Sequence, residues 1–180
     1  TGYLNSLTLE DLLRVGVSVA PYSGSMRHTL TYKAFQLSFN MLLNAGHVFK
    51  KSSISYQDLL NNSKGHREFE DRWKQVGDEI KSSVPSLPSS IIANRDLVYQ
   101  SSHIHFQSAT HIRFHDINMA YRLQGTKLNQ RLGMESLSLM VNARDLGIIW
   151  KKTNLNVDPS YAYSLYPPQR TYSFTLQLNF

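Results

Sequence analysis

The sequence predicts an all-β fold in which antiparallel strands form a segment of a transmembrane β-barrel with long extracellular loops. Three observations support this fold class. Five segments alternate apolar and polar side chains, which point to opposite faces of a strand. Each segment has roughly the 9–11 residues that a tilted strand needs to cross a bilayer. Short and long connections also alternate along the chain, as they do between the two rims of such a barrel.

The first two strands are predicted at residues 25–32 and 35–46. Their apolar side chains alternate with polar ones, and Lys33-Ala34 interrupts the pattern between them. Two alternating runs separated by two residues are typical of a β-hairpin. Leu42 is the one apolar residue on the face that is predicted to be polar.

Residues 47–110 are predicted to form a long loop insertion with one short helix. The segment is polar and rich in turn residues, and long insertions between strands are usually functional or mobile. Apolar residues at helical spacing place the helix near 66–81, and Pro85 and Pro88 prevent its continuation. These apolar residues are Phe69, Trp73, Val76 and Ile80. Residues 97–110 are ambiguous, with a short strand as one interpretation.

Three further strands are predicted at 111–123, 136–146 and 170–180. In the first of them, the apolar residues change from even to odd positions near His115-Asp116. A shift of one residue in the alternation is what a β-bulge produces. A second loop insertion, 147–169, precedes the last strand.

The connections give one consistent topology. If the last residue lies at the periplasmic rim, the strand directions alternate back to the first strand. The short connections at 33–34 and 124–135 then both lie on the periplasmic side, and both loop insertions lie outside. The polar faces would line the lumen, with Arg144 in an ion pair with Asp145. These lumen residues are Gln36, Ser38, Asn40, Asn142, Arg144, Thr175 and Gln177.

The composition excludes several classes of protein. The 180 residues contain no cysteine, so disulfides, cysteine zinc sites and thiol catalysis are excluded. No stretch approaches the roughly 18 consecutive apolar residues of a membrane-spanning helix. The net charge is +6, but Lys and Arg are scattered among Asp and Glu, which argues against nucleic acid as a partner. Because the chain begins at Thr1 without a methionine or a signal segment, we expect it to be a piece of a longer protein.

Enzyme activity is not expected. The sequence has no nucleophile elbow, Walker loop, dinucleotide fingerprint or H-E-x-x-H, so no catalytic residue and no cofactor is assigned. His103 and His105 would share one strand face if 97–106 were extended, and an H-x-H pair can supply two zinc ligands. A catalytic zinc site also needs a third ligand and a dry pocket, so exposed loop histidines are the favoured interpretation and no metal ligand is assigned. The hypothesis that the protein is a zinc hydrolase rests on this histidine cluster alone.

Five stretches of the sequence carry a family resemblance. They are YKAFQLSFN (32–40), FEDRWKQVGDE (69–79), HIRFHDINMAYRL (111–123), LSLMVNARDLGIIWKKTNLNVDPS (137–160) and YPPQRTYSFTLQLNF (166–180). In this order and spacing they resemble the late barrel hairpin, loop and strands of the SusC/RagA-type TonB-linked outer-membrane transporters. Val76, Ala120 and Gln124 depart from the family pattern, in which proline, glycine and proline are usual.

The resemblance implies that residues 1–180 are the C-terminal portion of a TonB-dependent receptor barrel, about the last five of 22 strands. The plug domain and the TonB box would lie upstream and are absent here. Such transporters lie in the bacterial outer membrane and import glycans or peptides together with a SusD-like surface lipoprotein that acts as a lid. Energy would come from TonB-ExbB-ExbD through the missing N-terminal part. The family has no catalytic residues.

Two groups of side chains are predicted to make functional contacts. One group would face outer-membrane lipid and end the assembly signal that the barrel-insertion machinery recognises: Tyr172, Phe174, Leu176, Leu178 and Phe180. The other group would contact substrate or the lid protein, or would instead pack the loops together. It consists of the loop aromatics Trp73, Trp150, Tyr161, Tyr163 and Tyr166.

The alternative function is a soluble β-sandwich carbohydrate-binding module that uses the loop aromatics. The two hypotheses differ in where the apolar faces of the strands point. A barrel points them outward to lipid, whereas a sandwich points them inward between two sheets.

Overall fold

The computed structural model describes residues 8–162 and 166–180. The chain divides into two compact units. Within the described residues, the sheet unit comprises Val17–Val48 and Ser108–Phe180, and the loop unit comprises Phe49–Gln107 with residues 8–16. No helix within the described ranges is long and apolar enough to span a membrane.

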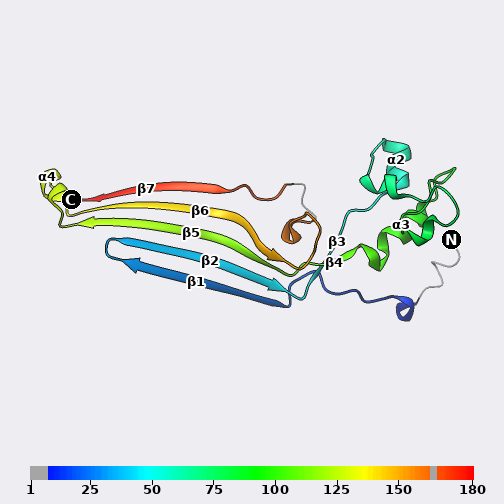
Figure 1. Cartoon of the computed structure of the whole chain (residues 1–180), viewed down its shortest axis with the longest axis horizontal. Coiled ribbons are helices and arrows are strands. Elements are labelled where there is room, and N and C mark those ends of the chain that lie inside the picture. The colour runs from blue at the N-terminus through cyan, green and yellow to red at the C-terminus, as the bar shows by residue number, and fades with distance from the viewer. Residues whose placement is uncertain (1–7, 163–165) are drawn as a thin grey trace. The chain divides into compact units, whose positions relative to one another are not determined.

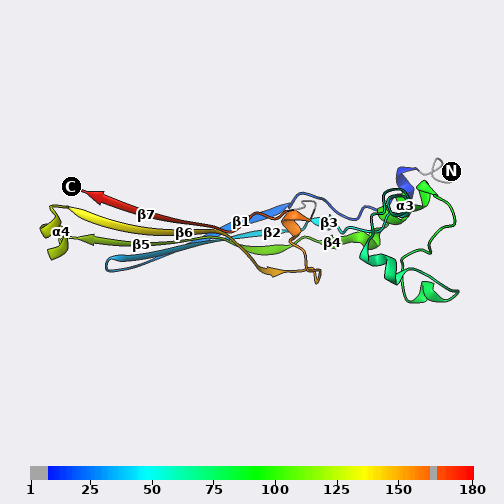
Figure 2. The same cartoon turned by 90° about the horizontal axis from the view of Figure 1, so that it is seen from above.

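The sheet unit is built on five long antiparallel strands in the order β1-β2-β5-β6-β7. Their bounds are Tyr22–Tyr32 (β1), Phe35–Ala45 (β2), His111–Gln124 (β5), Ser136–Lys151 (β6) and Thr171–Asn179 (β7). Figures 1 and 2 show these strands side by side in one twisted layer, and β1 and β7 form its two edges. The five predicted strands are confirmed, although β1 begins at Tyr22 and β6 continues to Lys151 instead of ending at 146.

The two short connections lie at the same end of the sheet (Figure 1). Between β1 and β2, Lys33 adopts a left-handed backbone with φ of 52°, and Lys33 and Ala34 alone make the turn. Between β5 and β6 lies a short helix, α4 (Lys127–Leu132), where only a polar connector was predicted. Asn129 fixes this connector, because its buried amide donates to the carbonyl oxygens of Leu123 at 3.0 Å and Glu135 at 3.3 Å.

The predicted β-bulge is present at His115. Asn40 pairs with Asp116, whereas the next residue of β2, Met41, pairs with Phe114, so His115 has no partner on β2. On the other side of β5 the pairing moves from Asp116↔Arg144 to Phe114↔Gly147. The bulge returns the apolar residues on its two sides to the same face of the sheet.

The loop unit contains two α-helices and several single 3-10 turns. The helices are α2 (Tyr56–Asn62) and α3 (Ala93–Ser101), and neither was predicted. The turns are η1 (Leu9–Asp11), η2 (Arg67–Asp71), η3 (Asp78–Ile80) and η4 (His103–His105). Two short strands, β3 (Val48–Lys50) and β4 (Phe106–Ser108), pair where the chain enters and leaves this unit. Residues 97–110 are therefore helix, 3-10 turn and only three residues of strand.

The helix predicted near 66–81 is wrong. The backbone of Arg72 is extended, with ψ of 152°, and Gly77 has φ of 97°, so the chain makes two separate turns. The Asp78 carboxylate accepts hydrogen bonds from the backbone N–H groups of Lys74 and Gln75, which stabilises the non-helical bend. Two residues of the helical pattern, Val76 and Ile80, are 98% and 88% exposed and form no buried face.

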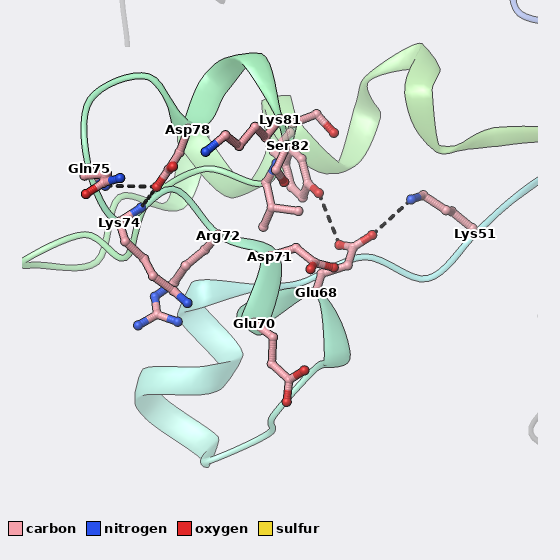
Figure 3. A pocket seen from close by; sticks show the side chains of 13 residues that line it. Lys51, Glu68, Glu70, Asp71, Arg72, Lys74, Gln75, Asp78, Lys81 and Ser82 are labelled. Carbon is pink, nitrogen blue, oxygen red and sulfur yellow. Dashed lines mark hydrogen bonds and ion pairs between the residues drawn. The ribbon is translucent and has the colours of Figure 1, made fainter.

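The core of the loop unit is small and lies beside a partly buried carboxylate, that of Glu68. Its buried side chains are Ile54, Tyr56, Val84 and Tyr99. Glu68 accepts hydrogen bonds from the Ile54 backbone N–H at 3.0 Å and the Tyr99 hydroxyl at 3.2 Å. It also accepts one from Lys51 Nζ at 3.1 Å, which Figure 3 shows as a dashed line. Burial alone would raise the pKa of Glu68, but these hydrogen bonds and the Lys51 charge outweigh it and lower the pKa. The same burial and the neighbouring Glu68 charge raise the pKa of Tyr99.

His105 is a buried histidine that packs against this core. It is fully buried, with its ring edge-on to Tyr99 at a centroid distance of 4.5 Å. Burial, followed by the Lys51 charge, lowers the pKa of His105. The Glu68 charge and the Tyr99 backbone carbonyl oppose this lowering only in part. Neither ring nitrogen of His105 has a hydrogen-bond partner among the described residues.

We expect Glu68→Gln to destabilise the loop unit, because one amide cannot accept all three hydrogen bonds. The loss should be about 1.5–3 kcal/mol, as for hydrogen bonds to a charged group. Hydrogen–deuterium exchange of the amides in 49–107 measures it, with the exposed Glu70→Gln as control. Because the folded pKa is lowered, the contribution is present above the ordinary value of 4.5 and is lost as the pH falls through the folded value. Equal exchange in the two variants would contradict this role.

Acidification below pH 6.5, the ordinary pKa of histidine, should destabilise the folded loop unit. The reason is that His105 binds a proton in the unfolded state at this pH, whereas the buried His105 of the folded state stays neutral until a lower pH. Opening, measured by amide exchange corrected for its intrinsic rate, should become more frequent by up to about tenfold per pH unit. His105→Phe should remove the effect between pH 6.5 and the onset of Glu68 protonation. His103→Phe, at an exposed position two residues away, should leave it unchanged. An unaltered pH profile in His105→Phe would refute the assignment.

Candidate functional site

The first candidate surface is the apolar face of the five-stranded sheet. Cross-strand partners lie on the same face of a sheet. The pairing register therefore joins apolar residues of all five strands into common rows. Two neighbouring rows are Leu30, Leu37, Met119, Val141, Phe174 and Tyr32, Phe35, Tyr121, Leu139, Leu176.

This apolar face is largely exposed. Phe174 is 76% exposed, Leu176 62% and Leu139 47%. Of the residues predicted to face lipid, Tyr172, Phe174, Leu176 and Leu178 lie on this face, and Phe180 follows β7 directly and is exposed. A contiguous exposed apolar surface of this kind marks a contact surface for another apolar phase or partner.

The second candidate surface is the opposite, polar face of the sheet, which is basic. Among the paired positions of this face, five residues are basic and one is acidic: Arg27, Arg113, Arg122, Arg144, Lys151 and Asp116. Three of the basic side chains have partners on their own chain. Arg113 pairs with Asp158, Arg122 donates to Ser138 Oγ at 3.4 Å, and Lys151 donates to the Leu155 carbonyl at 2.7 Å.

Arg27 and Arg144 differ from the other basic residues. Neither side chain has an ion-pair or hydrogen-bond partner in the part of the chain that the structure describes. The ion pair predicted between Arg144 and Asp145 is therefore absent. Asp145 lies in the irregular stretch of β6 opposite the bulge, with φ of 56°. This irregular backbone explains why the side chains of Arg144 and Asp145 do not form an ion pair.

Both free arginines line one polar hollow of about 340 Å³ at the β-bulge. Its other lining residues are Asn40, His115, Asp116, Asn118 and Asn142. Asn142 donates to Asn118, and Asn118 donates to Asp116 Oδ2 at 3.0 Å. Asp116 is only 8% exposed, and the buried Oδ1 of Asn40 has no hydrogen-bond partner among the described residues.

At the loop end of the sheet, residues 158–161 are anchored on the polar side of β5. The buried His111 ring bonds the Ala109 carbonyl through Nδ1 at 2.7 Å, so Nδ1 carries the proton. Its Nε2 lies 2.9 Å from Ser160 Oγ, in the turn η5 (Pro159–Tyr161). The Arg113–Asp158 ion pair and the Arg113 guanidinium over the Tyr161 ring hold the same turn.

The loop unit contains a third candidate, an open pocket of about 720 Å³ beside Glu68. Figure 3 shows side chains of both charges around it. Glu68 and Asp78 are already engaged in the hydrogen bonds described above, so the pocket serves the local fold. The His pair does not form the predicted strand face, since His103 and His105 lie in η4 and only His105 is buried. Among the described residues, no group of three or more His, Asp or Glu is arranged to hold a metal ion.

The predicted loop aromatics are not brought together in one site. Trp73 is partly buried in the loop unit, where its indole N–H donates to the Ser82 carbonyl. Trp150 lies in β6 rather than in a loop, paired with Ile112 on the apolar face. Tyr161 packs on Arg113, and Tyr166 is 83% exposed. Tyr163 lies outside the described residues.

Sequence reasoning missed the bulge hollow as a unit, although it had identified the bulge and had placed Asn40, Asn142 and Arg144 on the polar face. Arg27, Asp116 and Asn118 were not singled out. A signal was available, since Arg27 and Arg144 occupy polar positions in strands that are otherwise rich in Ser, Thr and Asn.

No family model and no curated protein matches the sequence. Among solved structures, the chain is similar to one described as "Structure of the RagAB peptide importer in the 'open-open' state", with a TM-score of 0.60 and 19% sequence identity. The alignment covers 97% of this chain but 19% of that chain. The described chain thus spans about a fifth of its neighbour's length and has the fold of that portion of it.

Proposed function

We propose that this chain is part of the barrel wall of a TonB-dependent importer in the bacterial outer membrane. The observation that carries the proposal is the in-register apolar face, which is exposed on all five strands and backed by a polar face. Lipid on one side and a wet lumen on the other match these two faces. The similarity to a portion of a peptide importer supports the same assignment.

The positions of amphipathic aromatics support a membrane orientation. Tyr22, Trp150 and Tyr172 lie near the loop ends of β1, β6 and β7, and Tyr32 ends β1 at the turn end. Trp and Tyr are enriched at the two interfaces of a bilayer, where their rings contact both lipid and water. The rows between them consist mainly of Leu, Met, Ile, Val and Phe.

The open edges of the sheet also favour a larger assembly. β1 and β7 each leave one row of backbone donors and acceptors without a strand partner in the sheet. Such edges require neighbouring strands in lipid, because unsatisfied backbone groups there cost several kcal/mol each. Additional strands of a longer chain, closing a barrel, would satisfy both edges.

The remaining parts of the function are proposed by extension. The importer would take up glycans or peptides together with a SusD-like surface lipoprotein, and TonB-ExbB-ExbD would supply energy. The loop unit, which exposes Leu97 and Val98 at 58% and 51%, offers an apolar contact for such a lipoprotein. The soluble sandwich module is not proposed, because Trp73 has an internal hydrogen bond and Trp150 belongs to the apolar face.

Leu176→Arg tests the lipid assignment. An arginine at the bilayer midplane should destabilise the barrel by about 2–4 kcal/mol. We expect a lower yield of heat-modifiable, membrane-inserted protein and unfolding at lower urea concentration. Gln177→Arg is the matched control, since it adds the same side chain to the polar face one residue away. If the two variants insert and unfold alike, the apolar face does not contact lipid.

A further inference from the structure

We propose that the hollow at the β-bulge is a carboxylate-binding subsite that receives acidic peptides, which rests on the proposed function because the polar face must line a wet passage. The subsite is formed by Arg27, Asn40, Asp116 and Arg144. These residues pair successively across β1, β2, β5 and β6, so they form one row of the sheet. The row brings together residues that are up to 117 positions apart (144 − 27).

The two arginines supply the attraction for an anion. Both are exposed, both line the same hollow, and neither has a partner among the described residues. Every other basic side chain at a paired position of this face is already engaged, so Arg27 and Arg144 are the cations that a ligand can reach. A guanidinium presents parallel N–H donors that match the two oxygens of a carboxylate.

Asp116 favours a monoanion over a dianion. Two arginines and one buried aspartate give the row a net charge of +1 (2 − 1). A single carboxylate neutralises this charge, whereas a phosphate dianion would leave an excess negative charge beside a carboxylate that is 8% exposed. The proposed ligand is therefore an acidic side chain or a C-terminal carboxylate.

Asn40 favours a peptide over a simple organic acid. Its Oδ1 is buried and accepts no hydrogen bond from any described residue, which leaves a polar atom that needs a donor. A peptide carries backbone N–H donors next to its carboxylates, and a rotation of the Asn40 side chain towards the hollow would bring this oxygen within reach of such a donor while the arginines hold the carboxylate. The bulge opens the hollow here, because His115 and Asp116 oppose one residue of β2.

The test uses the full-length parent protein, purified in detergent after its insertion has been verified by heat-modifiable mobility. The probe is a fluorescently labelled tetraglutamate peptide, and labelled tetraglutamine is its uncharged analogue. By fluorescence anisotropy, tetraglutamate should bind more tightly than tetraglutamine, and the difference should shrink at high salt. Arg27→Gln/Arg144→Gln should weaken tetraglutamate binding by about tenfold or more.

Arg122→Gln is the matched control, since it removes one positive charge from the same face outside the hollow. It should bind tetraglutamate like the wild-type protein. Equal binding of the two peptides to an inserted parent, or an equal loss in Arg122→Gln, would overturn the subsite while leaving the transporter assignment intact. Displacement of the peptide by inorganic phosphate at lower concentration than by acetate would overturn it in favour of phosphate anions. A double variant with unchanged peptide binding but lower thermal stability would assign the arginines to a carboxylate of the parent's own chain.

Discussion

The pairing register of the five long strands is the constraint on which both faces of the sheet depend. Side chains alternate with a period of two, so a slip of one residue would move every apolar side chain of a strand to the polar face. Without a bulge, the apolar residues of β5 on the two sides of His115 would point to opposite faces of the sheet, because the alternation changes phase at His115. The bulge absorbs the extra residue against β2, and a compensating irregularity at Asp145 and Leu146 absorbs it against β6. The bulge and the matching irregularity in β6 thus keep the apolar residues of all five strands on one face of the sheet.

Much of the sheet could be predicted because the alternation is a local property of the sequence. The five strands and the phase shift near His115-Asp116 follow from a window of a few residues. The end of β6 could not be predicted in this way, since the pairing skips Ile149 and the alternation around Trp150 is lost. Trp150 therefore looked like a loop residue although it belongs to the apolar face.

The helices of the loop unit could not be predicted for the opposite reason, because they depend on contacts between residues that are distant in sequence. α2 has only seven residues, too few to be stable alone, and is held by the Ser55 cap and by the Asp96 carboxylate of α3, which accepts from the Gln57 N–H at 2.8 Å. Around 66–81 the helical spacing was present, but no partner buries Val76 or Ile80, and Asp78 stabilises a bend instead. The bulge hollow was missed on similar grounds, since its row joins residues from four strands whose pairing is not fixed by the lengths of the intervening loops.

The free energies of the two faces of the sheet depend on the same pairing register. An arginine facing lipid at mid-membrane depth costs about 2–4 kcal/mol. In the observed register, Arg27 and Arg144 lie opposite the side that carries Met26, His28, Ala143 and their neighbours, so neither arginine would meet hydrocarbon. If the apolar face contacts lipid as proposed, a slipped register would turn these arginines towards lipid and Phe39 and Ile117 towards water, and the free energy of both faces would rise. In the proposed membrane setting, Arg27 and Arg144 would therefore disfavour misregistered pairing, in addition to the ligand contact proposed for them.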